Sequence, residues 1–146
     1  SWQITPEESV DTQAVYAYLT LLLPWPPSVN HYWGQVGNRR FIGKKGKEFR
    51  QHVLQSCLDM GVAPLEGRLA VHVSLNPPDR RKRDIDNILK ALLDACEHAG
   101  CYASDSQIDE LHVIRQTNIQ GVAALYWYTL FKDQLLPYPF LYHAKL

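Results

Sequence analysis

The chain has 146 residues, of which 46% are hydrophobic, and this length and composition suit one compact domain with a full core. Fifteen Lys and Arg residues balance fifteen Asp and Glu residues, so no net charge attracts a polyanion to the molecule as a whole. No apolar run approaches the ~20 residues of a membrane span, and the three cysteines lack zinc-site spacing. We therefore expect a cytoplasmic protein with reduced thiols and no membrane partner.

The start of the chain predicts an arm followed by a buried strand. Residues 1–16 are polar and lack periodicity, so we expect an N-terminal arm ahead of a domain that spans 17–131. The apolar segment 17–23 predicts the strand. The proline-rich segment 24–27 ends it, because proline cannot donate to a strand ladder.

The next segments predict a hairpin, a helix and a second strand. Residues 30–43 carry a Gly-Asn pair among aromatic and basic residues, which indicates a hairpin or a mobile loop. Helical spacing follows over 44–60. The apolar stripe of this helix consists of Phe49, Val53, Leu54, Cys57 and Leu58. Alternation from Leu69 to Leu75 predicts a strand.

The second half of the chain predicts one clear helix and two strands. Apolar residues from Ile85 to Ala99 recur every three or four positions, which is typical of an amphipathic helix. Strands are expected at 111–117 and 122–131, and 132–146 forms an aromatic-rich C-terminal tail. The order of elements predicts an α+β fold: a single domain with a small mixed, mostly antiparallel sheet and two main helices packed on it.

The most informative motif is a run of four cations followed at once by two aspartates. Residues 80–83 read Arg-Arg-Lys-Arg, and Asp84 and Asp86 follow with one residue between them. A polyanion is attracted to the cations, and the aspartates supply the oxygen ligands that a hard divalent cation prefers. A metal beside a phosphate can cut or transfer a phosphoryl group. We interpret the motif as a metal-dependent site that acts on nucleic acid.

Two short stretches hold ten of the fifteen Lys and Arg residues. Such patches can bind phosphate locally even on a neutral body. The candidate DNA-binding residues are Arg39, Arg40, Lys44, Lys45, Lys47, Arg50, Arg80, Arg81, Lys82 and Arg83.

Helix geometry constrains how the two aspartates could share a metal. Residues two apart point about 200° apart on a helix but the same way in an extended segment, so the helix must begin near Asp86. Lys90 lies one turn beyond Asp86, where it could neutralise charge on a scissile phosphate or form an ordinary i,i+4 pair. Asp94 and Asp105 are the candidates for a third carboxylate, and the reach of the chain favours Asp105 only modestly.

Each of these features alone has an ordinary structural explanation. Asp86 could simply cap a helix, and a basic run is more often a solvated surface. Two other functions stay open: a DNA-junction-binding module without catalysis, and an Mg²⁺-dependent nucleotidyl or glycosyl transferase that holds a nucleotide diphosphate on its aspartates. The coincidence of cations, aspartates, lysine and basic hairpin favours a nuclease over both.

Two segments resemble the RusA-type Holliday-junction resolvases. Residues 23–30 read LPWPPSVN, like the N-terminal motif of that family, and residues 78–90 read PDRRKRDIDNILK, like its central signature. Residues 91–95 and 105–108 continue the resemblance, which covers about 17–131.

The resemblance implies an Mg²⁺-dependent endodeoxyribonuclease, encoded by a bacterium or a phage, that works as a homodimer on four-way DNA junctions in recombination and repair. Mn²⁺ is expected to substitute. By matching position, Asp84, Asp86 and Asp105 are the implied metal ligands, and Lys90 is the implied catalytic lysine beside them. Ser104 departs from the family pattern, which often has an acid there, but the resemblance does not make this position a metal ligand, so we still expect activity.

Overall fold

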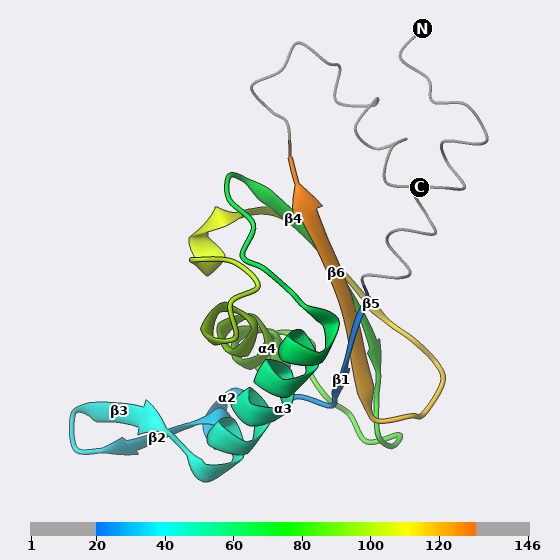
Figure 1. Cartoon of the computed structure of the whole chain (residues 1–146). Coiled ribbons are helices and arrows are strands. Elements are labelled where there is room, and N and C mark those ends of the chain that lie inside the picture. Colours follow the sequence, from blue (N-terminus) through cyan, green and yellow to red (C-terminus); the bar gives the residue numbers. More distant parts are fainter. Residues whose placement is uncertain (1–19, 131–146) are drawn as a thin grey trace, which may run out of the picture.

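The computed structural model describes residues 20–130, which form a sheet, two long helices and a projecting hairpin (Figure 1). The predicted arm, residues 1–16, and the predicted tail, residues 132–146, lie outside the described residues. The domain limits that we inferred from the sequence therefore stay predictions. No helix in the described part of the chain combines the length and the apolar character needed to cross a bilayer.

The main sheet has four strands in the order β1-β6-β4-β5. Its strands are β1 Leu21–Pro24, β4 Leu69–Asn76, β5 Ile108–Arg115 and β6 Val122–Thr129. β6 pairs antiparallel with both β1 and β4, whereas β4 and β5 run parallel. A parallel pair needs a crossover connection, and helix α4 supplies it between β4 and β5. The predicted α+β fold with a mixed, mostly antiparallel sheet is confirmed.

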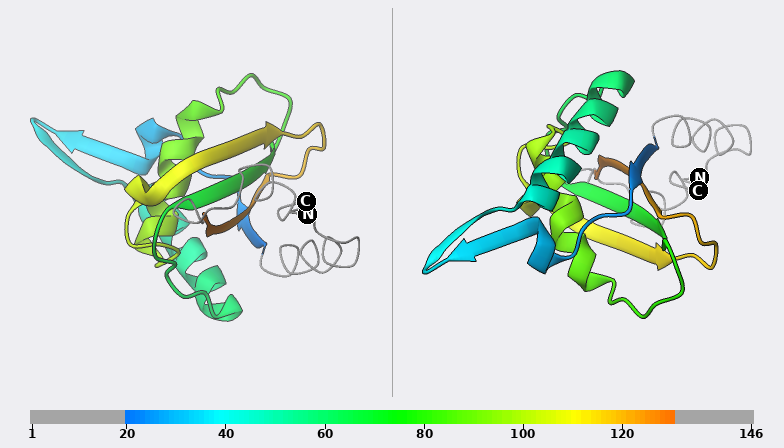
Figure 2. Two further views of the ribbon diagram at one scale, coloured as in Figure 1. Left: turned by 90° about the horizontal axis from the view of Figure 1, so that it is seen from above. Right: turned by 90° about the horizontal axis from the view of Figure 1, so that it is seen from below.

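Two long helices cover one face of this sheet (Figure 2). They are α3 Lys44–Met60 and α4 Asp86–His98, and the shorter helical elements are α2 Val29–Tyr32 and the 3₁₀ turn η1 Asp105–Gln107. Phe49, Val53 and Cys57 of α3 are buried, as their spacing predicts, but Leu58 is 67% exposed. Leu58 lies about 140° around the helix axis from Val53, which turns it away from the sheet. The stripe that we predicted is one residue too wide.

A two-stranded hairpin joins α2 to α3 and extends away from the sheet and helices (Figure 1). It consists of β2 Trp33–Val36 and β3 Arg39–Ile42, which pair antiparallel. Gly46, in the first turn of α3, lies so close to the backbone carbonyl of Tyr32 that any Cβ there would collide with it. This close approach fixes α2, and with it the base of the hairpin, against the start of α3.

A partly buried polar network links helices α2, α3 and α4. Arg50 Nη2 donates to Asp94 Oδ2 at 2.9 Å, and Arg50 Nε donates to Tyr32 Oη at 2.8 Å. Tyr32 Oη in turn donates to the same carboxylate oxygen at 2.5 Å. Burial alone would raise the pKa of Asp94, but the hydrogen bonds from Arg50 and Tyr32 outweigh it and the pKa is lowered. Asp94 and Arg50 therefore form an ion pair with each other within the fold.

The network predicts how stability depends on pH. Because the folded-state pKa of Asp94 is lowered, its contribution is fully present above the unfolded-state value of about 3.9 and is lost as the pH falls through the folded-state pKa. Asp94→Asn should lower the free energy of unfolding at neutral pH by about 2 kcal/mol, the typical loss for a charged hydrogen bond. Urea unfolding at several pH values measures this. The variant should also lose less stability than the parent below about pH 5.

Asp59→Asn is the matched control, because Asp59 is an exposed carboxylate on the same helix as Arg50 and accepts a hydrogen bond from Gln55. Its stability should follow the parent at every pH. Identical pH profiles for Asp94→Asn and the parent would contradict the role assigned to the network.

Candidate active site

The two aspartates of the basic motif lie where α4 begins. The helix starts at Asp86, as expected, and the N-cap residue Ile85 already has helical angles, φ −59° and ψ −45°. The backbone N–H of Asn87 donates to the carbonyl of Asp84, which closes the first turn. Since Ile85 is helical, the extended geometry that would point both aspartate side chains the same way does not occur in this structure.

The side chains of Asp84 and Asp86 are exposed. Within residues 20–130, neither carboxylate has a hydrogen bond or an ion pair with another residue. Nearby Asp79 differs, because it accepts hydrogen bonds from Arg81 Nε at 3.1 Å and from Arg83 Nη1 at 2.6 Å. The bond from Arg83 is the main cause of a lowered pKa at Asp79. Asp79 therefore pairs with Arg81 and Arg83. Asp84 and Asp86 stay available to a different cation.

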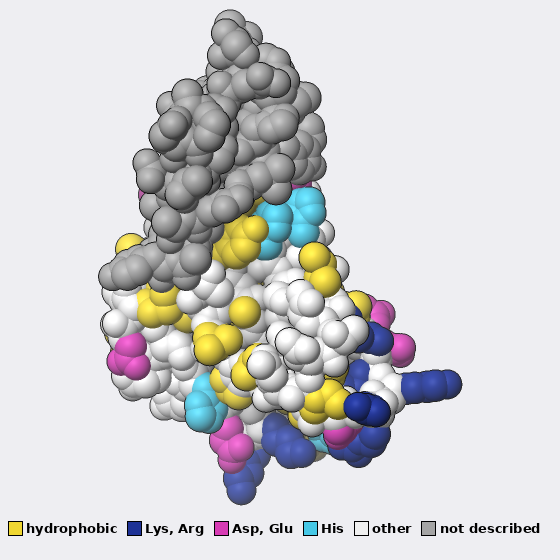
Figure 3. All heavy atoms as spheres, turned by 90° about the vertical axis from the view of Figure 1, so that its right-hand side faces the viewer, with side chains coloured by type: hydrophobic (Ala, Val, Ile, Leu, Met, Phe, Trp, Pro, Cys, Tyr) yellow, Lys and Arg dark blue, Asp and Glu magenta, His cyan; other side chains and the backbone are white. Residues whose placement is uncertain are grey.

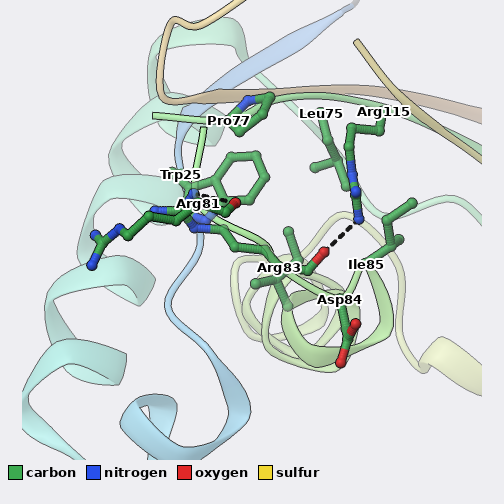
Figure 4. Close-up of a pocket in the computed structure, with 9 residues that line it drawn as sticks. Trp25, Leu75, Pro77, Arg81, Arg83, Asp84, Ile85 and Arg115 are labelled. Carbon is green, nitrogen blue, oxygen red and sulfur yellow. Dashed lines mark hydrogen bonds between the residues drawn. The ribbon is translucent and has the colours of Figure 1, made fainter. Parts of the chain in front are cut away.

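Arg83 is held in place by Asp79, Trp25 and Arg115, which come from three segments of the chain. Its guanidinium lies over the ring of Trp25 at 5.9 Å, and its backbone carbonyl accepts a hydrogen bond from Arg115 Nη2 at 2.5 Å. Figure 4 shows this bond, with Asp84 below it and its carboxylate directed away from Leu75 and Pro77. Sequence reasoning missed Arg115, which belongs to β5 and lies outside every recognisable motif. Its contribution depends on the long-range pairing of β5 with β4.

The third carboxylate, Asp105, lies beside Lys90. The Lys90 ammonium donates to Asp105 Oδ2 at 3.2 Å, and the two side chains are 56% and 31% exposed. The partner of Lys90 is thus a residue fifteen positions away rather than Asp86, one turn back on the same helix. Glu97, which the sequence analysis did not single out, accepts the backbone N–H of Asp105 at 2.6 Å. α4 therefore contributes both Lys90 and the side chain that anchors the Asp105 backbone.

Ser104, where the chain departs from the family pattern, has a structural role. Its hydroxyl accepts the backbone N–H of Ser106, and Gln107 accepts the backbone N–H of Ser104 at 3.0 Å, so the two residues form a capping box around η1. The Gln107 amide also donates to the carbonyls of Leu65 and Gly67. A serine at position 104 thus fixes the turn that carries Asp105.

The oxygen donors of this region suit a hard divalent cation by their chemistry. Asp84, Asp86 and Asp105 all supply carboxylates, and all three are at least partly exposed. In the described part of the chain, however, no three acidic, His or Cys side chains are grouped closely enough to hold a metal ion. Asp105 is paired with Lys90 instead. A shared site would need the three carboxylates to converge, so we treat metal binding by them as a proposal.

A groove of about 600 Å³ connects Asp84 to the basic stretch that spans residues 39–50. It runs from Asp84 and Asn87 at the start of α4, past Ser28 and His31, to Lys45 at the start of α3. Figure 3 shows several Lys and Arg side chains gathered at the lower end of the face that it presents, with Asp and Glu side chains beside them. Seven of the predicted DNA-binding cations are exposed and have no acidic partner within the described residues: Arg39, Arg40, Lys44, Lys45, Lys47, Arg80 and Lys82.

Residues 24–123, which carry all of these groups, match the family described as Endodeoxyribonuclease RusA. The chain belongs to the RusA family. The resemblance of its proline-rich and basic motifs to RusA-type proteins is therefore confirmed.

Individual relatives extend the RusA match over most of their own length. A protein of Enterobacteria phage HK97 named crossover junction endodeoxyribonuclease rusA is 41% identical over 101 residues, which cover 68% of this chain and 84% of the phage protein. The protein of that name from Enterobacteria phage 82 is 37% identical over 106 residues, 69% of this chain and 85% of its own. The protein of that name from Escherichia coli (strain K12) is 35% identical over 107 residues, 70% of this chain and 86% of its own.

Proposed function

We propose that this RusA-family chain is a metal-dependent endodeoxyribonuclease that resolves four-way DNA junctions in recombination and repair. The observation that carries the proposal is a pair of unpartnered carboxylates at the start of α4, of which Asp84 lines a groove that cations also line and Asp86 lies two residues further along. Exposed negative charge repels phosphate, so a surface that only binds DNA gains nothing from carboxylates at this position. A nuclease needs them to hold a cation there.

Asp84, Asp86 and Asp105 would hold the ion, for which we propose Mg²⁺, with Mn²⁺ able to substitute. When bound, such an ion polarises a phosphate oxygen and lowers the pKa of a coordinated water. Lys90 would place its ammonium beside the phosphate and stabilise negative charge as it develops during cleavage. The contact of Lys90 with Asp105 keeps both groups at the same spot before DNA binds.

Junction recognition would rest on shape and backbone charge, because the exposed Lys and Arg side chains are suited to phosphates. We propose a homodimer, since a two-fold axis places two sites for the paired, symmetric cuts that resolution requires. We also propose that the protein works in the cytoplasm of a bacterial cell, where such DNA occurs.

The experiment that tests this function compares a synthetic four-way junction with a linear duplex of the same arm sequence, each with and without Mg²⁺. Paired nicking of the junction that requires the metal is the expected result. Junction binding without nicking at any Mg²⁺ or Mn²⁺ concentration would instead favour a non-catalytic junction-binding module. Absence of any preference for the junction would contradict the proposal.

The exposed cations predict a steep salt dependence of DNA binding. The logarithm of the association constant should fall with the logarithm of salt concentration by about 0.9 for each duplex phosphate neutralised. Replacing the lysines of the first turn of α3 with alanine should therefore flatten the slope by about 0.9 per lysine that contacts DNA. Fluorescence anisotropy of a labelled junction at several salt concentrations measures this.

Two neighbouring cations provide an internal comparison for the salt experiment. Both are exposed, but Arg81 is already paired with Asp79, whereas Lys82 has no acidic partner within the described residues. Lys82→Ala should change the slope more than Arg81→Ala does. A slope that is unaltered when several of the exposed cations are removed would show that DNA binds to another face.

A further inference from the structure

The β2–β3 hairpin carries exposed apolar side chains on a projecting element. Val36 is 69% exposed and Phe41 is 48% exposed, although the hairpin has only four residues in each strand. Both views of Figure 2 show the hairpin extending beyond the helices. Apolar side chains gathered on such a projection indicate a surface that meets a partner.

The ring of Phe41 has a built seat on the neighbouring strand. Phe41 lies opposite Gly34 in the antiparallel ladder, and its ring atoms cover Gly34 so closely that a Cβ at this position would collide with them. Glycine therefore allows the ring to lie against the strand and present its other face outward. By the alternation of the strands, Val36 and Arg39 share this face of the hairpin with the ring.

The opposite face of the hairpin repeats the combination of an aromatic ring and a cation. The guanidinium of Arg40 lies 4.0 Å from the ring centroid of Trp33, which is the geometry of a cation–π contact. Arg39 and Arg40 are both exposed, and Glu48 is the only acidic residue between His31 and Arg50. A partner that fits this surface carries negative charge and flat apolar groups, a chemistry that unstacked nucleotides combine.

The hairpin lies next to the Lys45 end of the groove that Asp84 lines. β3 ends at Ile42, and after Gly43 the first turn of α3 begins with two lysines, of which Lys45 lines the groove together with Asp84. DNA that follows the groove from Asp84 past Lys45 therefore reaches the base of the hairpin.

We propose that the β2–β3 hairpin is a base-stacking arm, and that Phe41, seated on Gly34, stacks on a base at the branch point of the junction. Stacking between arms is interrupted at a branch point, so base faces are accessible there and not within linear duplex. Arg39 would hold the adjacent phosphate. The inference rests on the proposed junction-resolving function and adds a residue that sets specificity for branched DNA.

The test uses the full chain without divalent metal, so that no DNA is cut. Phe41→Ala should weaken binding to a four-way junction by about tenfold, a loss typical of one base–aromatic stack, and change duplex binding by less than about twofold. The salt dependence should stay the same, because no charge is removed. A 2-aminopurine base at the branch point should change its fluorescence when the parent binds but not when Phe41→Ala binds.

Three further variants separate stacking from folding and from general apolar contact. Gly34→Ala should reproduce the loss of junction affinity, because the new Cβ displaces a ring that is still present. Phe41→Tyr should retain the affinity. Leu58→Ala removes another exposed apolar side chain, from the last turn of α3, and should bind like the parent.

Several outcomes overturn the inference. One is a ratio of junction to duplex affinity in Phe41→Ala that equals the ratio in the parent. If the parent still selects and cuts junctions, this result leaves the proposed function intact. Another is a lower mass of Phe41→Ala in sedimentation, which would assign the hairpin to contact between subunits. A parent that does not select junctions at all refutes the proposed function and this inference with it.

Discussion

Replacing Asp84 or Asp86 with asparagine is expected to abolish junction cutting, with a loss of at least about 10³-fold, while junction binding persists or tightens. Each change removes one charged ligand and keeps the size of the side chain. Because neither carboxylate has a partner within residues 20–130, no contact in the described fold is lost. Binding can tighten because repulsion between the carboxylate and phosphate is removed. Single-turnover cleavage and the junction Kd without metal measure the two effects separately.

Asp59→Asn is a control for the loss of one negative charge, since Asp59 lies on the exposed side of α3 near the end opposite to the groove. Its cutting rate should equal that of the parent. Full activity in either Asp84→Asn or Asp86→Asn would refute the proposed role as a metal ligand. Loss of metal-free junction binding in parallel with cutting would also refute that role. A residue that only binds the metal is not needed to hold DNA when no metal is present.

The elements with strong periodicity could be predicted from the sequence. α4 keeps one apolar face throughout, with Ile88, Leu92 and Cys96 buried, and β4 alternates as a strand beneath helices should. β5 begins at Ile108 rather than at 111, where we predicted it. The polar residues at its start hid this strand from the sequence pattern. One of them, Asp109, is paired in the structure with Arg68, a residue forty-one positions earlier. An edge strand can hold such charges without losing its pairing.

The candidate site could be predicted in its residue types but not in its contacts. The basic run and its aspartates stand together in the sequence, so their chemistry was readable from composition and order. The pairing of Arg50 with Asp94 and the bond from Arg115 to the Arg83 carbonyl join segments that only tertiary packing brings together. Packing therefore decides which cations are free for DNA. Arg50, which we expected in the DNA-binding set, belongs to the internal network, and we leave it out of the proposed set.

Lys90→Ala is expected to slow cleavage by about 10²–10³-fold, by analogy with the removal of one preorganised donor to a developing negative charge. The competing explanation is that Lys90 is a surface residue that pairs with Asp105. An exposed ion pair is worth about 0.2–1 kcal/mol, so on that explanation its loss would barely alter the rate. Thermal unfolding of Lys90→Ala should match the parent in either case, which separates catalysis from stability.

A metal titration distinguishes direct action of Lys90 on the phosphate from action through Asp105. If Lys90 only positions Asp105, then Lys90→Ala should need more Mg²⁺ but recover the parent rate at saturation. If its ammonium stabilises charge on the phosphate, single-turnover cleavage of the saturated junction complex should stay slow at every Mg²⁺ concentration. Lys90→Arg should recover the rate only in part, because the larger planar group keeps the charge but not its compact placement. A near-normal rate in Lys90→Ala would leave the aspartates as the whole of the catalytic machinery.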